Sequence, residues 1–389
     1  MKYKVLALLL AVILAFGGLA GCAGTGVQNY DGGASAAPES SGTPDGGAED
    51  TRDYAAARAK YPLDTVVMTI NGSQVTWGEY FYWLYYSMSY IEQYVGTIPD
   101  LSAASMFDET QTYAQYFSVS ARDMVKQYHA LEVNAKAAGA SLTAEDEAYL
   151  QELLASDITA CVGEEGTEED FYAYLEGVYV SPELYSYINQ VSCLYNDCFD
   201  KLYGGSGELL SDEDAAAFSE ANGYMTAKHI LLSTVDTEGE ALSEEEKAAK
   251  LETAKNIAAQ LDAAEGDARL ALFDELMTDY SEDVGLPSYP EGYCFAKGKM
   301  DEAFETAVAG LEDYEISGIV ETQFGYHIIL RLPTEPDNLV EYYSETEQYT
   351  LRYLAAVDAY DVLVGNWITD AEAVWEPEFE NLDLNTLFA

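Results

Sequence analysis

The sequence is poor in positively charged residues and in histidine. Of its 389 residues, 18 are Lys or Arg, 69 are Asp or Glu and 3 are His, which gives a formal net charge of -51. A chain this acidic repels phosphate groups, so we expect no nucleic-acid partner and no attachment to anionic lipid through a basic patch. Three histidines also argue against a zinc enzyme with several histidine ligands. We therefore predict neither a metal nor another cofactor.

Cysteine is sparse as well, and its spacing suggests no metal site. No Cys-x-x-Cys pair occurs among the five cysteines, which are Cys22, Cys161, Cys193, Cys198 and Cys294. Two of them lie five residues apart in a helical stretch, a poor spacing for a bridge within one helix. Four buried or unpaired thiols are favoured over a disulfide framework for the cysteines after Cys22.

The first 22 residues have the features of an export signal. A short basic start precedes an apolar run over residues 5–16, which is too short to span a membrane comfortably. Residues 19–22 read Leu-Ala-Gly-Cys and resemble the lipobox of bacterial lipoproteins. The resemblance implies removal of residues 1–21 and a lipid on Cys22, which would anchor the protein at the extracytoplasmic face of the cell membrane. The alternative is an ordinary signal peptide followed by an accidental cysteine.

A tether and a mostly helical module are expected next. Residues 22–60 are rich in Gly, Ala, Ser, Pro and Asp, which predicts a flexible tether with order beginning near Tyr61. Within 61–222, a strand over 66–70 and a tight turn precede a helix that opens at Thr76. A long helix over about 109–138 follows, and three further helix starts are expected at Thr143, Thr167 and Ser211.

Residues 223–334 predict a compact α+β domain. Strands are expected over 225–232, 293–295 and 325–332, with two helices between the first and the second. The last segment, 335–389, contains an amphipathic pattern over about 339–368 that predicts one long helix. Such a helix must bury its apolar face, and the N-terminal helical module is the candidate partner.

Several short motifs between 224 and 333 follow one another in a characteristic order. They are Ala227-Lys228-His229-Ile230-Leu231, Tyr280-Ser281-Glu282-Asp283, Phe295-x-x-Gly298-x-Met300-x-x-x-Phe304-Glu305 and Val320-Glu321-Thr322-Gln323-Phe324-Gly325-Tyr326-His327. This region resembles the parvulin family of peptidyl-prolyl cis–trans isomerases. The order of lipobox, tether and helical module is similar to that of PrsA-type foldase lipoproteins and SurA-like chaperones.

The resemblance implies a fold and a set of functional residues. The fold would be a small antiparallel sheet with surrounding helices, joined to a chaperone module built from the N- and C-terminal segments. The positions that match the catalytic network of the family are His229, Asp283, Thr322 and His327, and those that match its proline slot are Met300, Phe304 and Phe324. The reaction needs an apolar slot and a polar network around the twisted amide, and it needs no nucleophile or metal.

Each of these residues also has a simpler interpretation. A lone histidine in a strand is more often a core residue, but two of only three histidines fall on family positions. Met300 and Phe304 have the spacing of ordinary core residues, and Asp283 alone would be a solvated loop carboxylate. His129 matches nothing in the family, and we expect a surface or helix-capping imidazole there.

The chain departs from the family pattern in two places. A run that often reads Gly-Gly-x-Leu-Gly is replaced by residues 289–294, Tyr-Pro-Glu-Gly-Tyr-Cys, so a leucine that often helps line the slot is missing. The loop over 234–240 is acidic, whereas phospho-specific parvulins carry basic residues there. A phosphate dianion would be repelled, which argues against specificity for phosphorylated residues before proline.

Two functions of different classes remain open at this stage. The first is a lipid-anchored foldase that isomerises Xaa-Pro bonds and holds unfolded secreted proteins. The second is a binding protein on a catalytically weak or inactive parvulin scaffold. Tyrosines crowd the 62–100 and 171–203 stretches, where they could hold unfolded segments or simply build the helix interfaces.

Overall fold

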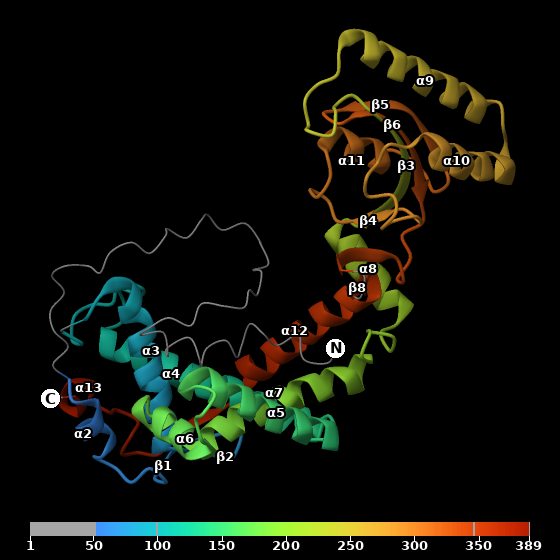
Figure 1. The fold of residues 1–389 in the computed structure, drawn as a ribbon. Helices are drawn as coiled ribbons and strands as arrows, with labels where there is room; N and C mark the ends of the chain where they lie inside the picture. The colour runs from blue at the N-terminus through green and yellow to red at the C-terminus, as the bar shows by residue number, and fades with distance from the viewer. Residues whose placement is uncertain (1–51, 99, 345–346, 389) are drawn as a thin grey trace. The chain divides into compact units, whose positions relative to one another are not determined.

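The computed structural model describes residues 52–98, 100–344 and 347–388 (Figure 1). The chain divides into two compact units, a first unit of the residues up to Leu202 together with those from Val362, and a second unit of Tyr203–Asp361. The first unit is therefore built from two segments that are far apart in the sequence. The proposed signal peptide and Cys22 lie outside the described residues.

The first unit is mostly helical. Its described elements are α2 (Tyr54–Arg58), β1 (Val66–Ile70), β2 (Ser73–Thr76), α3 (Trp77–Val95), α4 (Tyr113–Ala137), α5 (Ala144–Val162), α6 (Glu168–Gly177), α7 (Pro182–Tyr203), β9 (Ala373–Trp375) and α13 (Leu384–Leu387). The hydroxyls of Thr76, Thr143 and Thr167 accept hydrogen bonds from backbone N–H groups three residues later. These N-caps satisfy donors that each new helix leaves unpaired, and they confirm the helix starts that the sequence predicts.

The C-terminal segment completes the small sheet of the first unit. Strand β1 lies between β2 and β9, and Met68 pairs with Trp375. Beyond β9, Phe379 is buried and its ring lies 4.8 Å from that of Tyr61. Phe388 lies 5.1 Å from the ring of Tyr54. The sheet and the aromatic core therefore both depend on residues from the end of the chain.

The second unit contains a four-stranded antiparallel sheet with the order β4-β3-β6-β5 (Figure 1). Its described elements are α8 (Asp212–Asn222), β3 (Met225–Ser233), α9 (Glu244–Asp262), α10 (Gly266–Tyr280), β4 (Tyr293–Phe295), α11 (Glu302–Ala309), β5 (Ile316–Thr322), β6 (Gly325–Leu332), β7 (Leu339–Ser344) and β8 (Glu347–Thr350), followed by α12 (Leu351–Asp370), which continues into the first unit. The α+β fold class expected from the sequence is confirmed.

The two faces of this sheet have different partners. Ile230 and Leu232 point into a core shared with α9 and α10, whereas Ala227 and Ile329 belong to a second cluster with Phe304 of α11. Side chains alternate between the faces of a strand, so every second residue of β3 shares the α11 face. The odd-numbered residues His229 and His327 therefore project from the face that α11 only partly covers.

Three expectations about elements are wrong. The predicted helix over 339–368 begins only at Leu351, because residues 339–350 pair as the β7–β8 hairpin. Aromatic and β-branched residues are frequent in that stretch, and they favour strands. The predicted tether contains α2, which is capped by Asp53 and buries Ala57 completely. Strand β5 was not expected as a separate element.

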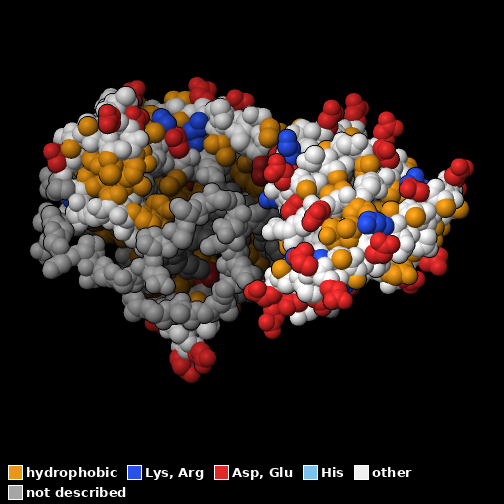
Figure 2. All heavy atoms as spheres, turned by 90° about the horizontal axis from the view of Figure 1, so that it is seen from above, with side chains coloured by type: hydrophobic (Ala, Val, Ile, Leu, Met, Phe, Trp, Pro, Cys, Tyr) orange, Lys and Arg blue, Asp and Glu red, His pale blue; other side chains and the backbone are white. Residues whose placement is uncertain are grey.

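Acidic side chains dominate the surface. Figure 2 shows carboxylates over both parts of the visible face, with few lysines and arginines among them. Within the described ranges, no helix combines the length and apolar character needed to cross a bilayer.

Candidate functional site

Two histidines face each other on neighbouring central strands. In the antiparallel register, His229 pairs with Ile329 and Leu231 pairs with His327, so the two histidines are diagonal neighbours on one face. Their Nδ1 atoms lie 2.9 Å apart and their rings stack with centroids 5.1 Å apart. Both side chains are buried.

A chain of hydrogen bonds extends from this pair in both directions. The hydroxyl of Thr322 lies 2.8 Å from His327 Nε2, and Asp283 Oδ2 lies 3.1 Å from His229 Nε2. Asp283 also accepts a 2.6 Å hydrogen bond from the hydroxyl of Tyr293. Thr322, His327, His229, Asp283 and Tyr293 thus form one continuous polar network.

The chemistry of the two ends fixes where the protons lie in this network. An ionised carboxylate can only accept, so His229 Nε2 carries a proton, and a neutral His229 then accepts at Nδ1. The proton between the rings therefore belongs to His327 Nδ1, which leaves His327 Nε2 to accept from Thr322. The Thr322 oxygen accepts in turn from the backbone N–H of Phe324, at 3.1 Å. This arrangement satisfies every bond with both rings neutral.

The pKa values agree with this assignment. Burial, together with the proximity of His229, lowers the pKa of His327 from 6.5 to about 4. Burial acts to raise the pKa of Asp283, but hydrogen bonds from His229, Tyr293 and the Gly285 N–H outweigh it and lower the value to about 2. At neutral pH, His327 is therefore neutral and Asp283 is ionised.

The network lies beside a pocket of about 500 Å3. Phe304 contacts both imidazoles edge-on, at 5.2 Å from His229 and 5.5 Å from His327. Met300 and Tyr293 line the pocket as well, which gives it an apolar wall opposite a polar floor. A pyrrolidine ring is apolar and fits a surface of this kind.

The structure brings the predicted site residues together. His229, Asp283, His327, Met300, Phe304 and Phe324 all line this pocket. Phe324 lies at the surface with 49% of its side chain exposed. Thr322 does not line the pocket; its hydroxyl contacts His327 from behind. The individual catalytic and binding roles of these residues stay predictions.

The comparison with protein families decides the identity of this part of the chain. A family model described as rotamase, PPIC-type PPIase domain, matches residues 229–332. The chain carries a PPIC-type PPIase domain. The match begins at His229 within β3, ends with β6 at Leu332, and includes all the residues of the hydrogen-bonded network.

Curated relatives match over short segments. The chain is 31% identical to a foldase protein PrsA of Clostridium botulinum over 118 residues, which are 30% of this chain and 29% of that protein. It is 48% identical to the foldase protein PrsA 1 of Bacillus cereus over 59 residues, which are 15% of this chain and 20% of that protein. These matches therefore span less than a third of each relative.

Solved structures resemble the chain over longer stretches but only weakly. The crystal structure of PrsA from Bacillus subtilis covers 74% of this chain at 20% identity, with 98% of that structure matched and a TM-score of 0.24. A SurA-like chaperone structure from Campylobacter jejuni covers 78% of this chain at 17% identity, with 92% of that structure matched and the same score. Scores of this size carry no argument about how the parts are arranged.

The PPIase domain contains a residue of the network that sequence reasoning missed. Tyr293 lies in the segment that departs from the family pattern, and its hydroxyl bonds Asp283 while its ring packs edge-on against His229 at 5.6 Å. It occupies part of the pocket wall where the expected leucine is absent. The signal available in the sequence was a tyrosine placed two residues before the motif phenylalanine, Phe295.

The chemistry of the PPIase site is noncovalent. Rotation about an Xaa-Pro bond has a barrier of ~18–20 kcal/mol, because it breaks the amide resonance. Both imidazoles, Asp283 and Thr322 are engaged in hydrogen bonds with each other, so no activated nucleophile is presented to the pocket. The site can bind the ring in an apolar slot and hold fixed dipoles around an amide as it twists.

The expectation for His129 is wrong. This side chain is only 3% exposed, and its Nδ1 lies 2.9 Å from Ser73 Oγ while its Nε2 lies 3.0 Å from Glu79 Oε1. It therefore links β2, α3 and α4 from within the first unit. The sequence did not reveal this role because both partners lie more than forty residues away.

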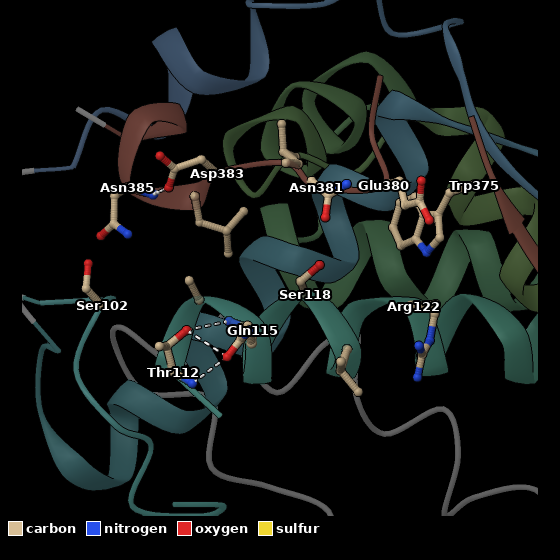
Figure 3. A pocket seen from close by; sticks show the side chains of 14 residues that line it. Ser102, Thr112, Gln115, Ser118, Arg122, Trp375, Glu380, Asn381, Asp383 and Asn385 are labelled. Carbon is tan, nitrogen blue, oxygen red and sulfur yellow. Dashed lines mark hydrogen bonds between the residues drawn. The ribbon is translucent and has the colours of Figure 1, made fainter. Parts of the chain in front are cut away.

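A second, polar pocket of about 460 Å3 lies in the first unit. Figure 3 shows Gln115, Ser118 and Arg122 of α4 facing a C-terminal segment that carries Asn381 and Asn385. Arg122 donates to Asp123 at 2.7 Å, so its charge is already paired. None of the predicted site residues lies here.

Proposed function

We propose that this chain is a foldase that accelerates the cis–trans isomerisation of Xaa-Pro bonds at the PPIase pocket. The observation that carries the proposal is the hydrogen-bonded chain of Thr322, His327, His229 and Asp283 beside an apolar wall. A PPIC-type domain with this intact network has the parts that the reaction needs. The names of the curated relatives, foldase protein PrsA, point the same way.

A binding protein on an inactive scaffold is the alternative. The sequence supports this alternative only through the altered segment over 289–294, where the leucine that often helps line the slot is missing. In the folded protein, that segment supplies Tyr293 to both the pocket wall and the network, so the departure replaces one contact with another. This favours the enzyme over the alternative.

The test is an isomerisation assay on the full chain, purified in detergent. We expect acceleration with unphosphorylated Xaa-Pro peptides. His229→Ala, His327→Ala and Asp283→Ala should each slow the reaction about ten- to a hundredfold, because loss of a partner in a buried network costs ~1–3 kcal/mol. Their effects should be less than additive. If wild-type protein accelerates no Xaa-Pro peptide, the binding-protein alternative replaces this proposal.

The proposal includes the holding of unfolded segments by the first unit. Several tyrosines in the two rich stretches build interfaces, since Tyr80, Tyr82 and Tyr185 are buried. Tyr90 and Tyr94, however, are 43% and 72% exposed at the end of α3. We expect Tyr90→Ser/Tyr94→Ser to weaken suppression of client aggregation while the isomerisation of short peptides is unchanged. Equal suppression by the variant would remove these residues from the proposal.

We also propose that the protein is lipid-anchored through Cys22 at the extracytoplasmic face of the membrane. The lipobox-like residues 19–22 support this location. Cys22→Ala should release the protein into the medium or leave an unprocessed precursor. A variant that is processed and still bound to the membrane would contradict the anchor.

The proposed activity is not phospho-specific. The acidic loop over 234–240 borders the pocket, and Asp236 is one of the residues that line it. A peptide with phosphothreonine before proline should be isomerised more slowly than its unphosphorylated form. Preference for the phosphopeptide would overturn this part of the proposal.

A further inference from the structure

The lining of the PPIase pocket carries charge of one sign. Four carboxylates border it, from Asp236, Glu282, Asp283 and Asp301. No Lys or Arg is among the lining residues that the structure describes. The net charge of the whole chain does not explain this arrangement, because lysines do lie elsewhere on the domain, as Lys228 does beside Asp274.

The pocket has two chemically different ends along β3. At His229, the lining side chains are the aromatic Phe304 and Tyr293, together with Asp283, whose carboxylate is bonded to His229 and Tyr293. At Ser233, four residues further along the strand, the backbone N–H donates to Glu282 at 2.8 Å. A strand rises about 3.3 Å per residue, so the two ends are about 13 Å apart.

The acidic end is held in a defined shape. The loop that follows β3 closes on itself, since Leu242 N–H donates to Thr234 O and Asp236 N–H donates to Glu240 O, at 2.9 and 2.8 Å. Asp236 Oδ1 accepts from the backbone N–H groups of Glu238 and Glu240, both at 2.9 Å. The Asp236 carboxylate is thereby fixed in place at an exposed position of the pocket edge.

The other carboxylates that line the pocket differ in the partners that they already bind. Asp283 is used by the network, and Glu282 is paired with Lys250 as well as with Ser233. Asp301 caps α11 through one oxygen, by accepting from the Ala303 N–H. The caps on Asp236 and Asp301 leave their negative charges in place, whereas Lys250 already offsets the charge of Glu282, so Asp236 is the main carboxylate of this end that can attract a cation.

We infer that the PPIase pocket selects Xaa-Pro bonds in which the residue immediately before proline is Lys or Arg. The inference rests on the proposed function. With the pyrrolidine ring against Phe304, the preceding residue lies about 3.8 Å further along the chain, and a long cationic side chain extends from there toward Asp236 and Glu282. The stem of such a side chain can pack on apolar surface, such as Phe324, while its charge stays near solvent.

The size of the preference follows from the exposure of these carboxylates. Exposed ion pairs are weak, so Asp236, with a smaller contribution from the paired Glu282, should favour a Lys-Pro over a Leu-Pro peptide by about two- to fivefold in kcat/KM. Glu before proline should be disfavoured relative to Leu for the same reason. Salt should reduce the selectivity, because exposed charges are screened.

The experiment compares peptides that differ only in the residue before proline, which is Lys, Leu or Glu. Both kcat/KM and the Kd for each peptide are measured on the full chain in detergent, at low and high salt. The test variant is Asp236→Asn, which keeps one acceptor oxygen and removes the charge. The matched control is Glu265→Gln, which removes one charge from an exposed position of the same domain outside the pocket lining.

We expect the Lys-to-Glu ratio to fall toward one in the test variant and to be retained in the control. Equal ratios in wild type and test variant, or equal loss in the test and control variants, would overturn the inference. If no peptide is isomerised but the Lys-Pro peptide still binds most tightly, and loses that advantage in Asp236→Asn, the proposed function fails while the selectivity stands. If neither turnover nor binding depends on the preceding residue, the selectivity is refuted whatever the activity.

Discussion

At the scale of single residues, the hydroxyl of Tyr293 distinguishes this site. It donates to Asp283 at 2.6 Å, and this bond helps hold the pKa of Asp283 at about 2. Burial and the neighbouring Asp283 raise the pKa of Tyr293 itself. The tyrosine therefore stays protonated and acts as a permanent donor. The network therefore depends on where the Tyr293 hydroxyl lies and not on its ability to lose a proton.

We predict that Tyr293→Phe slows isomerisation about three- to tenfold, since a hydrogen bond to a charged group contributes ~1.5–3 kcal/mol and His229 still supports Asp283. The pKa of Asp283 should rise, which NMR titration of its carboxyl carbon would show. The matched control is Tyr326→Phe, on the opposite face of the sheet within the α9–α10 core. An unchanged Asp283 pKa in Tyr293→Phe would exclude Tyr293 from the network.

His327 gives the protein a specific pH dependence. In an unfolded chain this histidine would bind a proton near pH 6.5, whereas in the fold it stays neutral down to about pH 4. Between these values the unfolded state binds more protons, so the free energy of unfolding falls as pH falls, by about 3 kcal/mol in total. Isomerisation should decline as His327 gains a proton near pH 4. NMR spectra of a His327→Gln variant would assign the imidazole resonances of His327. If those resonances titrated above pH 6, the predicted low pKa of His327 would be contradicted.

At the scale of elements, His129 joins three pieces of the first unit. The imidazole of α4 reaches Ser73 at the start of β2 and Glu79 in the first turn of α3. Both contacts are within a largely buried environment, since Glu79 is only 11% exposed at its side chain. The histidine therefore has a structural role in the unit, away from the PPIase pocket.

We predict that His129→Ala lowers the free energy of unfolding of the first unit by ~2–4 kcal/mol, because it leaves a cavity and two polar groups without their partner. The PPIase domain should keep its activity on short peptides. Urea unfolding followed by tryptophan fluorescence measures the first effect, because Trp77 and Trp83 are buried in this unit. A substitution at the exposed Lys136 of the same helix would serve as the control, and equal stability of both variants would refute the structural role.

The sequence predicted some elements well and others poorly, for physical reasons that differ. Helix starts at Thr143 and Thr167 were predictable because a cap is a local interaction over three residues. The β7–β8 hairpin was mistaken for helix because its aromatic pattern also suits an amphipathic helix. The facing of His229 and His327 could be expected only through a family resemblance, since they lie 98 residues apart. No local pattern in the sequence indicates the role of His129, because its partners Ser73 and Glu79 lie far away along the chain.

At the scale of the whole molecule, the first unit is discontinuous. Residues 52–202 need the returning segment, which supplies β9 and the buried Phe379, Leu384 and Phe388.

We predict that a 52–202 fragment shows no cooperative thermal unfolding by circular dichroism, and that adding a 362–388 peptide restores it. A fragment over 224–333, with its own two cores, should unfold cooperatively alone. Cooperative unfolding of 52–202 alone at ordinary stability would contradict the prediction.

The pairing of β1 with β9 sets an order of events during synthesis. Domains generally fold as they emerge, starting from the N-terminus, but here β1 waits for a strand made some three hundred residues later. The inserted PPIase domain can finish first. Until Ala373–Trp375 arrive, β1 presents an open edge that other strands can join. A chain that stalls or is cleaved before residue 373 therefore keeps this edge open, so incomplete copies can pair with strands of other chains and aggregate.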